Sequence, residues 1–214
     1  MKHKSLNETA YEIIRDKILK GEFSLGSRLR EDLLAEEISM SRTPVREAIN
    51  RLVADGLIIN RVRKGLYLIQ PEDHEIEDYI DIRNALEQLA VEKCIRNLTK
   101  EQKEELEGNL KKFVSAFERG DYEKCNVLDA EFHQIIARIS GNKKLLQMLK
   151  DLSVFFQLVR HTEKLTQPRE KNERTIEEHS KIAEAIFAGD VEAAREAVTE
   201  NIETMRNNLH LKKR

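Results

Sequence analysis

Apolar residues recur at helical spacing in three short stretches near the start of the chain. This periodicity predicts helices over residues 6–20 and 31–39, and a third helix that begins at Pro44. Gly21 ends the first helix and Asp55-Gly56 ends the third, because glycine accepts the left-handed backbone conformation that closes a helix. The pattern therefore indicates three helices, each with one apolar stripe.

Two β-rich runs follow the third helix, with a basic turn between them. The runs are Leu57-Ile58-Ile59 and Leu66-Tyr67-Leu68-Ile69, and the turn contains Arg61, Arg63 and Lys64. Short apolar runs on either side of a polar turn are typical of a β-hairpin. Three helices followed by a basic hairpin predict a winged helix-turn-helix.

The start of the third helix is rich in groups that can bind DNA. Thr43 suits the N-cap position and Pro44 the first helical position, where its missing N–H costs nothing. Arg42 and Arg46 are four residues apart, so they lie on one face near the end from which side chains reach base edges. Taken alone, these two arginines fit solvated surface charges equally well. Together with the basic wing, whose cations would meet phosphates or a minor groove, they predict DNA binding.

Beyond residue 74, nearly all of the chain has helical periodicity. The candidate helices span residues 75–97, 101–118, 121–139, 143–163, 172–188 and 190–210. The short breaks between them imply antiparallel neighbours. We therefore predict a mainly α protein with an N-terminal winged helix-turn-helix domain over residues 1–70, a polar linker over 71–74 and a C-terminal all-α antiparallel helical bundle over 75–214.

Charge is divided unevenly between these two parts. The chain has 214 residues and a net charge of −2, but residues 1–71 hold 13 Lys and Arg against 10 Asp and Glu, a net +3. The remaining residues hold 24 and 29, a net −5, which indicates two domains with different partners. No run approaches 18 apolar residues, and the two cysteines form no disulfide framework. We expect a cytoplasmic protein with no membrane partner.

Three polar residues interrupt apolar stripes of the predicted bundle. Asp129 and His133 share one helix face that also holds Phe132 and Ile136, and His179 precedes another apolar stripe. Imidazoles and a carboxylate that converge inside a bundle suit a divalent transition metal, most simply Zn²⁺ or Ni²⁺. The alternative is that Asp129 only hydrogen-bonds His133 while His179 lies elsewhere. The spacing alone leaves both interpretations open.

The N-terminal sequence resembles the DNA-binding domain of GntR-type bacterial regulators. The resemblance rests on Gly21-x-Phe23-x-x-Gly26-x-x-Leu29, Leu34-Ala35, Ser41-Arg42-Thr43-Pro44-Val45-Arg46-Glu47-Ala48-Ile49 and the glycine of the wing. It implies that Arg42 and Arg46 contact bases and that Gly65 lets the wing approach DNA. Some members carry a further DNA-contacting arginine where this chain has Asp32, so Arg30 is the nearby candidate for that role.

The C-terminal sequence resembles the FCD effector domain of the FadR subfamily. The similar residues are Asp129-x-x-Phe132-His133 and Glu178-His179-x-x-Ile182-x-x-Ala185-Ile186-x-x-Gly189-Asp190-x-x-x-Ala194. The resemblance implies a divalent metal held by Asp129, His133, His179 and a further histidine, at the position where this chain has Asn201. Because an amide oxygen binds borderline metals less well than imidazole, Asn201 is a weaker fourth ligand. His210 and His161 are poorer candidates for the fourth metal ligand.

The same resemblance implies that Arg83 binds the effector. In the family, an arginine in this Arg-x-x-x-Glu context pairs with a carboxylate of the ligand, and a guanidinium fork matches that group. The alternative is an exposed Arg83 paired with Glu87 one turn later.

Three classes of function fit these features. The first is a ligand-responsive transcription regulator that binds a palindromic operator as a homodimer and senses a small organic acid, with a bound metal. The second is a metal-dependent enzyme acting on a small carboxylate, fused to a DNA-binding domain. The third is a structural DNA-binding protein without an effector, which buried polar residues disfavour. No nucleophile motif is present, so we expect no enzyme activity.

Overall fold

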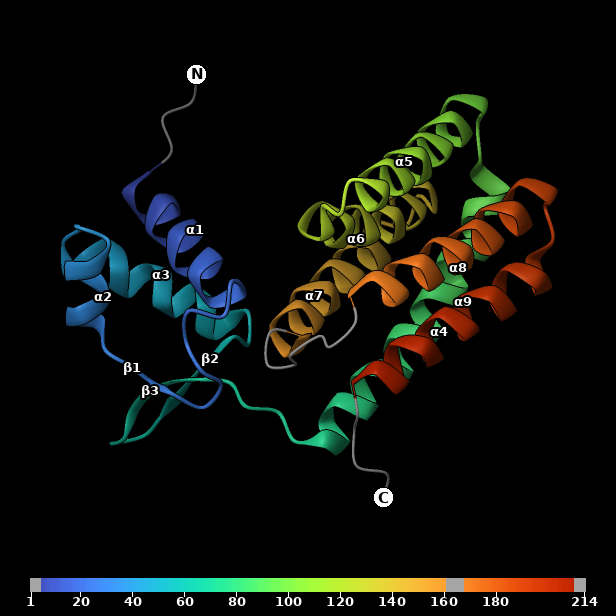
Figure 1. Cartoon of the computed structure of the whole chain (residues 1–214). Helices are drawn as coiled ribbons and strands as arrows, with labels where there is room; N and C mark the ends of the chain where they lie inside the picture. The colour runs from blue at the N-terminus through green and yellow to red at the C-terminus, as the bar shows by residue number, and fades with distance from the viewer. Residues whose placement is uncertain (1–4, 161–167, 210–214) are drawn as a thin grey trace. The chain divides into compact units, whose positions relative to one another are not determined.

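The computed structural model describes residues 5–160 and 168–209 (Figure 1). Within these residues it divides into two compact units, one formed by residues 5–72 and 154–160, the other by residues 73–153 and 168–209. Within the described residues, none of the helices is long and apolar enough to cross a membrane.

The first unit is a winged helix-turn-helix, as the sequence predicts. Its elements are α1 (Leu6–Leu19), β1 (Arg28–Leu29), α2 (Glu31–Glu37), α3 (Arg42–Ala54), β2 (Ile58–Arg61) and β3 (Gly65–Leu68). The three strands form an antiparallel sheet in the order β1-β3-β2. The apolar stripes of the helices meet in one core that includes Ile14, Val45, Ile49, Leu52 and Leu68, all fully buried.

One local prediction for this unit was wrong, and one short strand was not predicted. Helix α3 begins at Arg42, so its N-cap is Ser41 and not Thr43, and Pro44 is the third helical residue. Proline is accepted there because the first four N–H groups of a helix have no partner within it. The sequence pattern also missed β1, which has only two residues and exists because it pairs with β3 of the wing.

The second unit is an all-α bundle, also as predicted. Its helices are α4 (Asp73–Asn97), α5 (Lys100–Glu118), α6 (Tyr122–Ile139), α7 (Lys143–Arg160), α8 (Pro168–Ala188) and α9 (Val191–Asn208). The part of α7 from residue 154 on belongs to the first unit. Helix α5 packs against α6, α8 against α9, and α4 against α9 (Figure 1). The predicted helix ends at residues 163 and 210, as well as His161 and His210, lie outside the described residues.

Helix boundaries in the second unit follow recognisable caps. Thr99 and Gln102 form a capping box at the start of α5, and the Asp121 and Asp190 side chains accept backbone N–H groups at the starts of α6 and α9. Helix α8 begins four residues earlier than predicted because Pro168 opens it, a position that tolerates proline. Helix α4 begins at Asp73, which shortens the predicted linker.

Both cysteines are buried residues of the bundle. Cys94 and Cys125 are fully buried and form no disulfide. Burial raises the pKa of the Cys94 thiol to about 12, so this side chain stays protonated and unreactive. The cysteines therefore contribute packing.

Candidate functional site

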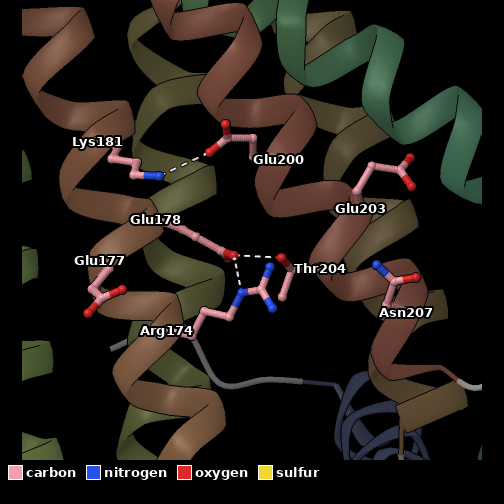
Figure 2. Close-up of a pocket in the computed structure, with 8 residues that line it drawn as sticks. All are labelled: Arg174, Glu177, Glu178, Lys181, Glu200, Glu203, Thr204 and Asn207. Atoms are coloured by element: carbon pink, nitrogen blue, oxygen red, sulfur yellow. Dashed lines mark hydrogen bonds and ion pairs between the residues drawn. The ribbon is translucent and has the colours of Figure 1, made fainter.

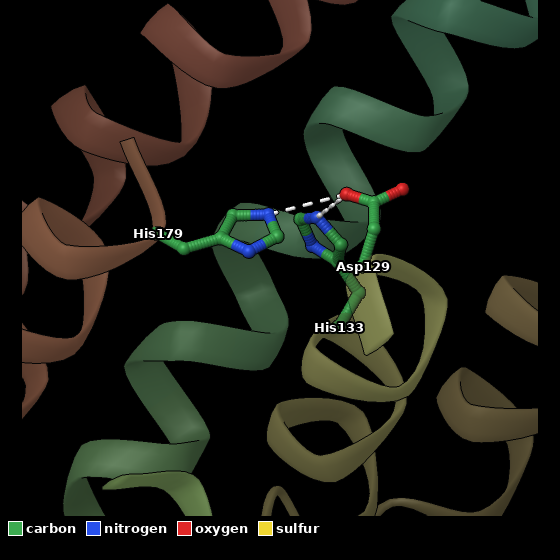
Figure 3. A group of neighbouring side chains, drawn as sticks. All are labelled: Asp129, His133 and His179. Atoms are coloured by element: carbon green, nitrogen blue, oxygen red, sulfur yellow. Dashed lines mark ion pairs between the residues drawn. The ribbon is translucent and has the colours of Figure 1, made fainter. Parts of the chain in front are cut away.

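Three polar side chains meet inside the bundle. Asp129 and His133 project from one face of α6, one turn apart, and His179 reaches them from α8 (Figure 3). Asp129 Oδ1 lies 3.3 Å from His179 Nε2 and 4.0 Å from His133 Nε2. One ligand atom from each of the three residues lies within 4.8 Å of the others. The structure therefore brings together three of the four residues that the sequence marks as metal ligands.

His179 is the most enclosed member of this cluster. Its side chain is fully buried, its ring stacks on Phe132 at 4.2 Å between centroids, and Phe113 meets it edge-on. Neither ring nitrogen has a hydrogen-bond partner among the described residues, although Nε2 is within ion-pair distance of Asp129. Burial lowers the pKa of His179, and the nearby Asp129 opposes that effect only in part. A neutral imidazole with an unused lone pair is the form that ligates a metal.

A buried carboxylate orients the second imidazole. Glu87 Oε2 lies 2.7 Å from His133 Nδ1, so the Nδ1–H of His133 donates to Glu87 and Nε2 faces Asp129. Burial would raise the pKa of Glu87, but Arg83 and His133 outweigh burial and lower it to about 2. Carboxylates in this position fix the tautomer and orientation of metal-bound histidines.

Arg83 is buried, and it pairs with the same carboxylate. Its Nε donates to Glu87 Oε1 at 2.6 Å, and Nη1 lies 3.1 Å from the sulfur of Met205. Only 8% of the residue is exposed. The pairing with Glu87 that the sequence suggested is therefore present, but inside the bundle and not on its surface. Glu87 connects Arg83 to His133, so the candidate effector residue lies one carboxylate away from the Asp/His cluster.

The donor set fits a divalent transition metal. Tetrahedral Zn²⁺ with nitrogen and oxygen ligands at about 2.0–2.1 Å separates its ligand atoms by about 3.4 Å. The contact between Asp129 and His179 already has that length, and the contact between Asp129 and His133 must shorten by less than ~1 Å. Nε2 of His179, which faces Asp129 and has no hydrogen-bond partner among the described residues, is a buried polar atom that a metal would satisfy.

Asn201, the fourth candidate ligand, binds a neighbouring carboxylate. Its Nδ2 donates to Glu178 Oε2 at 2.8 Å. Glu178, although buried, also accepts from Thr204 Oγ1 at 2.6 Å and Arg174 Nε at 3.0 Å. In this arrangement the amide nitrogen of Asn201 contributes to the contact between α8 and α9.

Glu178 belongs to a polar groove between α8 and α9, with a volume of about 250 Å³ (Figure 2). The charged side chains along it pair with one another: Arg174 with Glu178, and Lys181 with Glu200 at 3.1 Å. The Lys181–Glu200 pair joins α8 to α9, whereas the Arg174–Glu178 pair lies within α8, and we assign the groove no ligand.

The start of α3 presents the predicted DNA-binding side chains to solvent. Arg42, Thr43 and Arg46 are exposed, whereas the neighbouring Pro44 and Val45 are buried in the core. Because α3 starts at Arg42, this arginine lies beside the free N–H groups of the first turn, which favour a phosphate. Arg46 lies one turn further along the same face.

The wing adds a second group of cations. Arg61, Arg63 and Lys64 are all exposed at the turn between β2 and β3, and the Arg61 guanidinium lies 4.8 Å from the centre of the Tyr67 ring. Gly65 has a φ of +101°, which a residue with a Cβ rarely adopts.

Arg28 on β1 is a basic neighbour that the sequence pattern did not single out. Its guanidinium lies 3.4 Å from the position a Cβ on Gly65 would occupy, and its strand register pairs it with Tyr67. The pairing of β1 with the wing places this cation beside Gly65. No local sequence motif predicts that pairing.

Arg30, the candidate substitute for a further DNA contact, is bound by Asp32. Its Nε donates to Asp32 Oδ1 at 3.1 Å, and Asp32 in turn raises the pKa of the guanidinium. Arg30 is exposed but partly neutralised by the residue that replaces the family's arginine. It is therefore the weakest of the predicted DNA contacts.

A winged helix-turn-helix with a basic recognition helix, followed by a helical bundle with an inward Asp/His cluster, defines the class of DNA-binding transcription regulators that contain an effector domain. Residues 6–68 match the model of bacterial regulatory proteins of the gntR family, and residues 78–204 match the FCD domain. The chain belongs to the gntR family, with the FCD type of effector domain.

Individual regulators are similar over nearly the whole chain. The HTH-type transcriptional regulator YdhC of Bacillus subtilis is 30% identical over 88% of this chain and 84% of its own length. The HTH-type transcriptional repressor RspR of Escherichia coli is 26% identical over 95% and 89%. The solved structure of Escherichia coli McbR/YncC is 28% identical with a TM-score of 0.83, covering 97% of this chain and 98% of McbR.

Proposed function

We propose that this regulator binds a palindromic operator as a homodimer and releases it in response to a small organic acid sensed by the FCD domain. Support for a repressor comes from the relative RspR, which is named as one. A twofold operator follows from the symmetry of a dimer, each protomer placing one α3 in a major groove. The ligand acts through different affinities for the DNA-binding and released states.

The single observation that best supports sensing in the bundle is the Asp129, His133 and His179 cluster, with the fully buried imidazole of His179 facing Asp129. These three residues would hold the metal, and Glu87 would orient His133. A bound Zn²⁺ or Ni²⁺ would supply a Lewis-acidic position for a carboxylate oxygen. Arg83, connected to the cluster through Glu87, would bind the far end of the same ligand.

Asn201 is not one of the principal metal ligands in this proposal. Its contact with Glu178 leaves three side-chain ligands as the principal donor set. A site with three protein ligands has room for an effector oxygen.

The rival proposal is a metal-dependent enzyme, since three ligands and an open position can also activate water. The candidate general base would have to be Glu87, but Arg83 and His133 hold this carboxylate at a pKa of about 2, too low for a base near neutral pH. We therefore favour a sensor. Hydrolysis or decarboxylation of small carboxylates by the metal-loaded protein would favour the enzyme instead.

The first experiment measures metal content. Protein purified without chelators or a metal-affinity tag should contain about one divalent transition metal ion per chain, measured by elemental analysis, because three ligands converge in each bundle. The variant His133→Ala should lose it, since one of the three imidazole and carboxylate ligands is gone.

The matched control is Glu131→Ala, which removes an exposed carboxylate from the same helix and should retain the metal. Thermal unfolding with and without added Zn²⁺ gives a second measurement, since a ligand of the folded state raises the melting temperature. Absence of metal from the wild type even after Zn²⁺ is added back, with no shift in melting, would contradict the metal site.

A further inference from the structure

A second groove of the bundle lies on the side of α6 that faces away from the Asp/His cluster. It has a volume of about 300 Å³ and lies between α5, α6 and the start of α7. Glu131, Ile135 and Arg138 of α6 line it. At 100° per residue, these positions are on the opposite side of the helix from Asp129 and His133. The groove is therefore separate from the candidate metal site, and its volume suits a small ligand.

Asn109 of α5 forms the buried floor of this groove. Only 4% of the residue is exposed, and its Nδ2 donates to the backbone oxygen of Leu128 at 3.3 Å. That bond fixes the amide, and the buried Oδ1 has no hydrogen-bond partner among the described residues. Buried acceptors without a partner are uncommon and costly. The floor of the groove therefore offers an acceptor to an O–H or N–H group of a ligand.

Two lysines flank the groove and supply positive charge. Lys112 comes from α5 and Lys150 from α7; both are exposed, and neither forms an ion pair with another described residue. The third cation, Arg138, is bound by Glu105 across α5 and α6. A planar guanidinium selects carboxylates, whereas ammonium groups on flexible stems act as point charges and bind phosphate. Because the guanidinium is occupied, the available cations favour a phosphate.

The groove is cationic although the unit around it is acidic. Lys112, Lys150 and Arg138 against Glu105 and Glu131 give three cations and two anions, a net +1. Residues 72–214 as a whole have a net charge of −5. A long polyanion such as DNA would be repelled by the surrounding surface, whereas a small anion meets mainly the local charges. The charge distribution therefore selects a small ligand.

The lining between the lysines and the floor is mixed in polarity. Ile135 and Leu146 are half-buried apolar side chains, and Gln134 places a half-buried amide beside them. An amide both donates and accepts hydrogen bonds, so it suits hydroxyl groups. A polyol offers hydroxyl groups together with C–H surface for the apolar residues. The uncharged part of the ligand should therefore be a hydroxylated carbon chain or ring.

We propose that this groove binds a small phosphorylated polyol, such as a sugar phosphate. The phosphate lies between Lys112 and Lys150, and a hydroxyl group donates to Asn109 Oδ1. The carbon skeleton covers Ile135 and Leu146. This inference goes beyond the proposed function, because the ligand is a phosphate held on the outer side of α6 and not a carboxylate held at the Asp/His cluster.

The test is isothermal titration calorimetry of the full chain with three probes, namely inorganic phosphate, glucose and glucose 6-phosphate as the sugar phosphate. The sugar phosphate should bind with a dissociation constant of about 1 mM or less. Inorganic phosphate should bind more weakly and glucose not measurably, because the phosphate provides the charge and the hydroxyl groups provide the remaining hydrogen bonds. Absence of heat from the sugar phosphate up to about 10 mM would overturn the proposal.

Lysine variants locate the phosphate. Lys112→Ala and Lys150→Ala should each weaken binding of the sugar phosphate by about fivefold or more, and the double variant by about 30-fold or more. The matched control is Lys111→Ala, which removes the neighbouring exposed lysine that does not line the groove and should bind as the wild type does. Because these side chains are exposed, the melting temperature should not change. Equal affinities for the double variant and the wild type would exclude the groove as the binding site.

The variant Asn109→Leu tests the floor of the groove. It removes the acceptor for one hydroxyl group, so affinity for the sugar phosphate should fall about fivefold or more. Inorganic phosphate contacts only the lysines and should bind as it does to the wild type. Circular dichroism checks the fold. An equal loss of affinity for both probes would overturn the hydroxyl contact and leave Asn109 a packing role.

A phosphate could also bind a metal at the Asp/His cluster, and two variants separate the sites. His133→Ala should bind the sugar phosphate normally, and the Lys112→Ala/Lys150→Ala variant should keep the metal content of the wild type. Loss of sugar phosphate binding in His133→Ala, with normal binding in the double lysine variant, would place the phosphate at the metal. That result would overturn this inference and leave the proposed function standing.

Discussion

At the residue scale, one buried carboxylate organises the interior of the bundle. Glu87 accepts from the guanidinium of Arg83 and from the imidazole of His133, so it balances one buried charge and orients one candidate ligand. Buried charges are costly unless they are paired, and breaking a buried pair costs more than the pair contributes. Glu87 is therefore the position where stability and the sensing site are most directly coupled.

The variant Glu87→Gln should lower the free energy of unfolding by about 3 kcal/mol, because Arg83 would keep its buried charge without a carboxylate. Urea unfolding in the presence of a chelator measures this change without any contribution from metal. Glu131→Gln on the exposed face of α6 is the control and should change stability by less than about 0.5 kcal/mol. An effect of Glu87→Gln no larger than the control would mean that the Arg83–Glu87 pair is not buried in solution.

Sequence spacing identifies some of these residues better than others. Asp129 and His133 are one turn apart among apolar residues, so their shared inward face is predictable. Glu87 is different, because a pair at four-residue spacing has the same pattern on an exposed helix as inside a bundle. Its burial is decided by α6 and α9 packing against α4, which is information that no local pattern contains.

At the element scale, the start of α3 decides which side chains DNA would meet. The helix begins two residues before Pro44, so Arg42 occupies its first position and Arg46 the next turn. The helices of both units could be predicted from apolar periodicity, since each buries one stripe. Strand β1 could not be predicted in this way, because its two residues are extended only through their pairing with the wing.

The variant Arg46→Ala should weaken specific DNA binding by about 30-fold or more, because the dimer loses one base contact in each half-site, at about 1–3 kcal/mol each. Fluorescence anisotropy with a DNA site selected by the wild type from a random library measures the change. The fold should be unaffected, since Arg46 is exposed. Lys20→Ala removes an exposed cation at the end of α1 and should leave affinity nearly unchanged. Equal affinities for Arg46→Ala and the wild type would show that this face of α3 does not read the operator.

At the scale of the whole molecule, the separation of charge assigns the two units to different partners. The excess of positive charge lies in the first 71 residues and the excess of negative charge in the rest. A polyanion should therefore bind the winged unit and be repelled by the bundle. A net charge near zero for the chain conceals this division.

Salt dependence of operator binding tests the division of charge. Each phosphate that a cation neutralises contributes about −0.9 to the slope of log K against log salt concentration. Arg63→Ala removes one exposed wing cation per protomer, so the slope for a dimer should become less negative by about two. Lys111→Ala on α5 removes an exposed cation from the acidic unit and should leave the slope unchanged. If both variants change the slope equally, DNA contacts extend over the bundle, and the acidic unit is part of the DNA-binding surface.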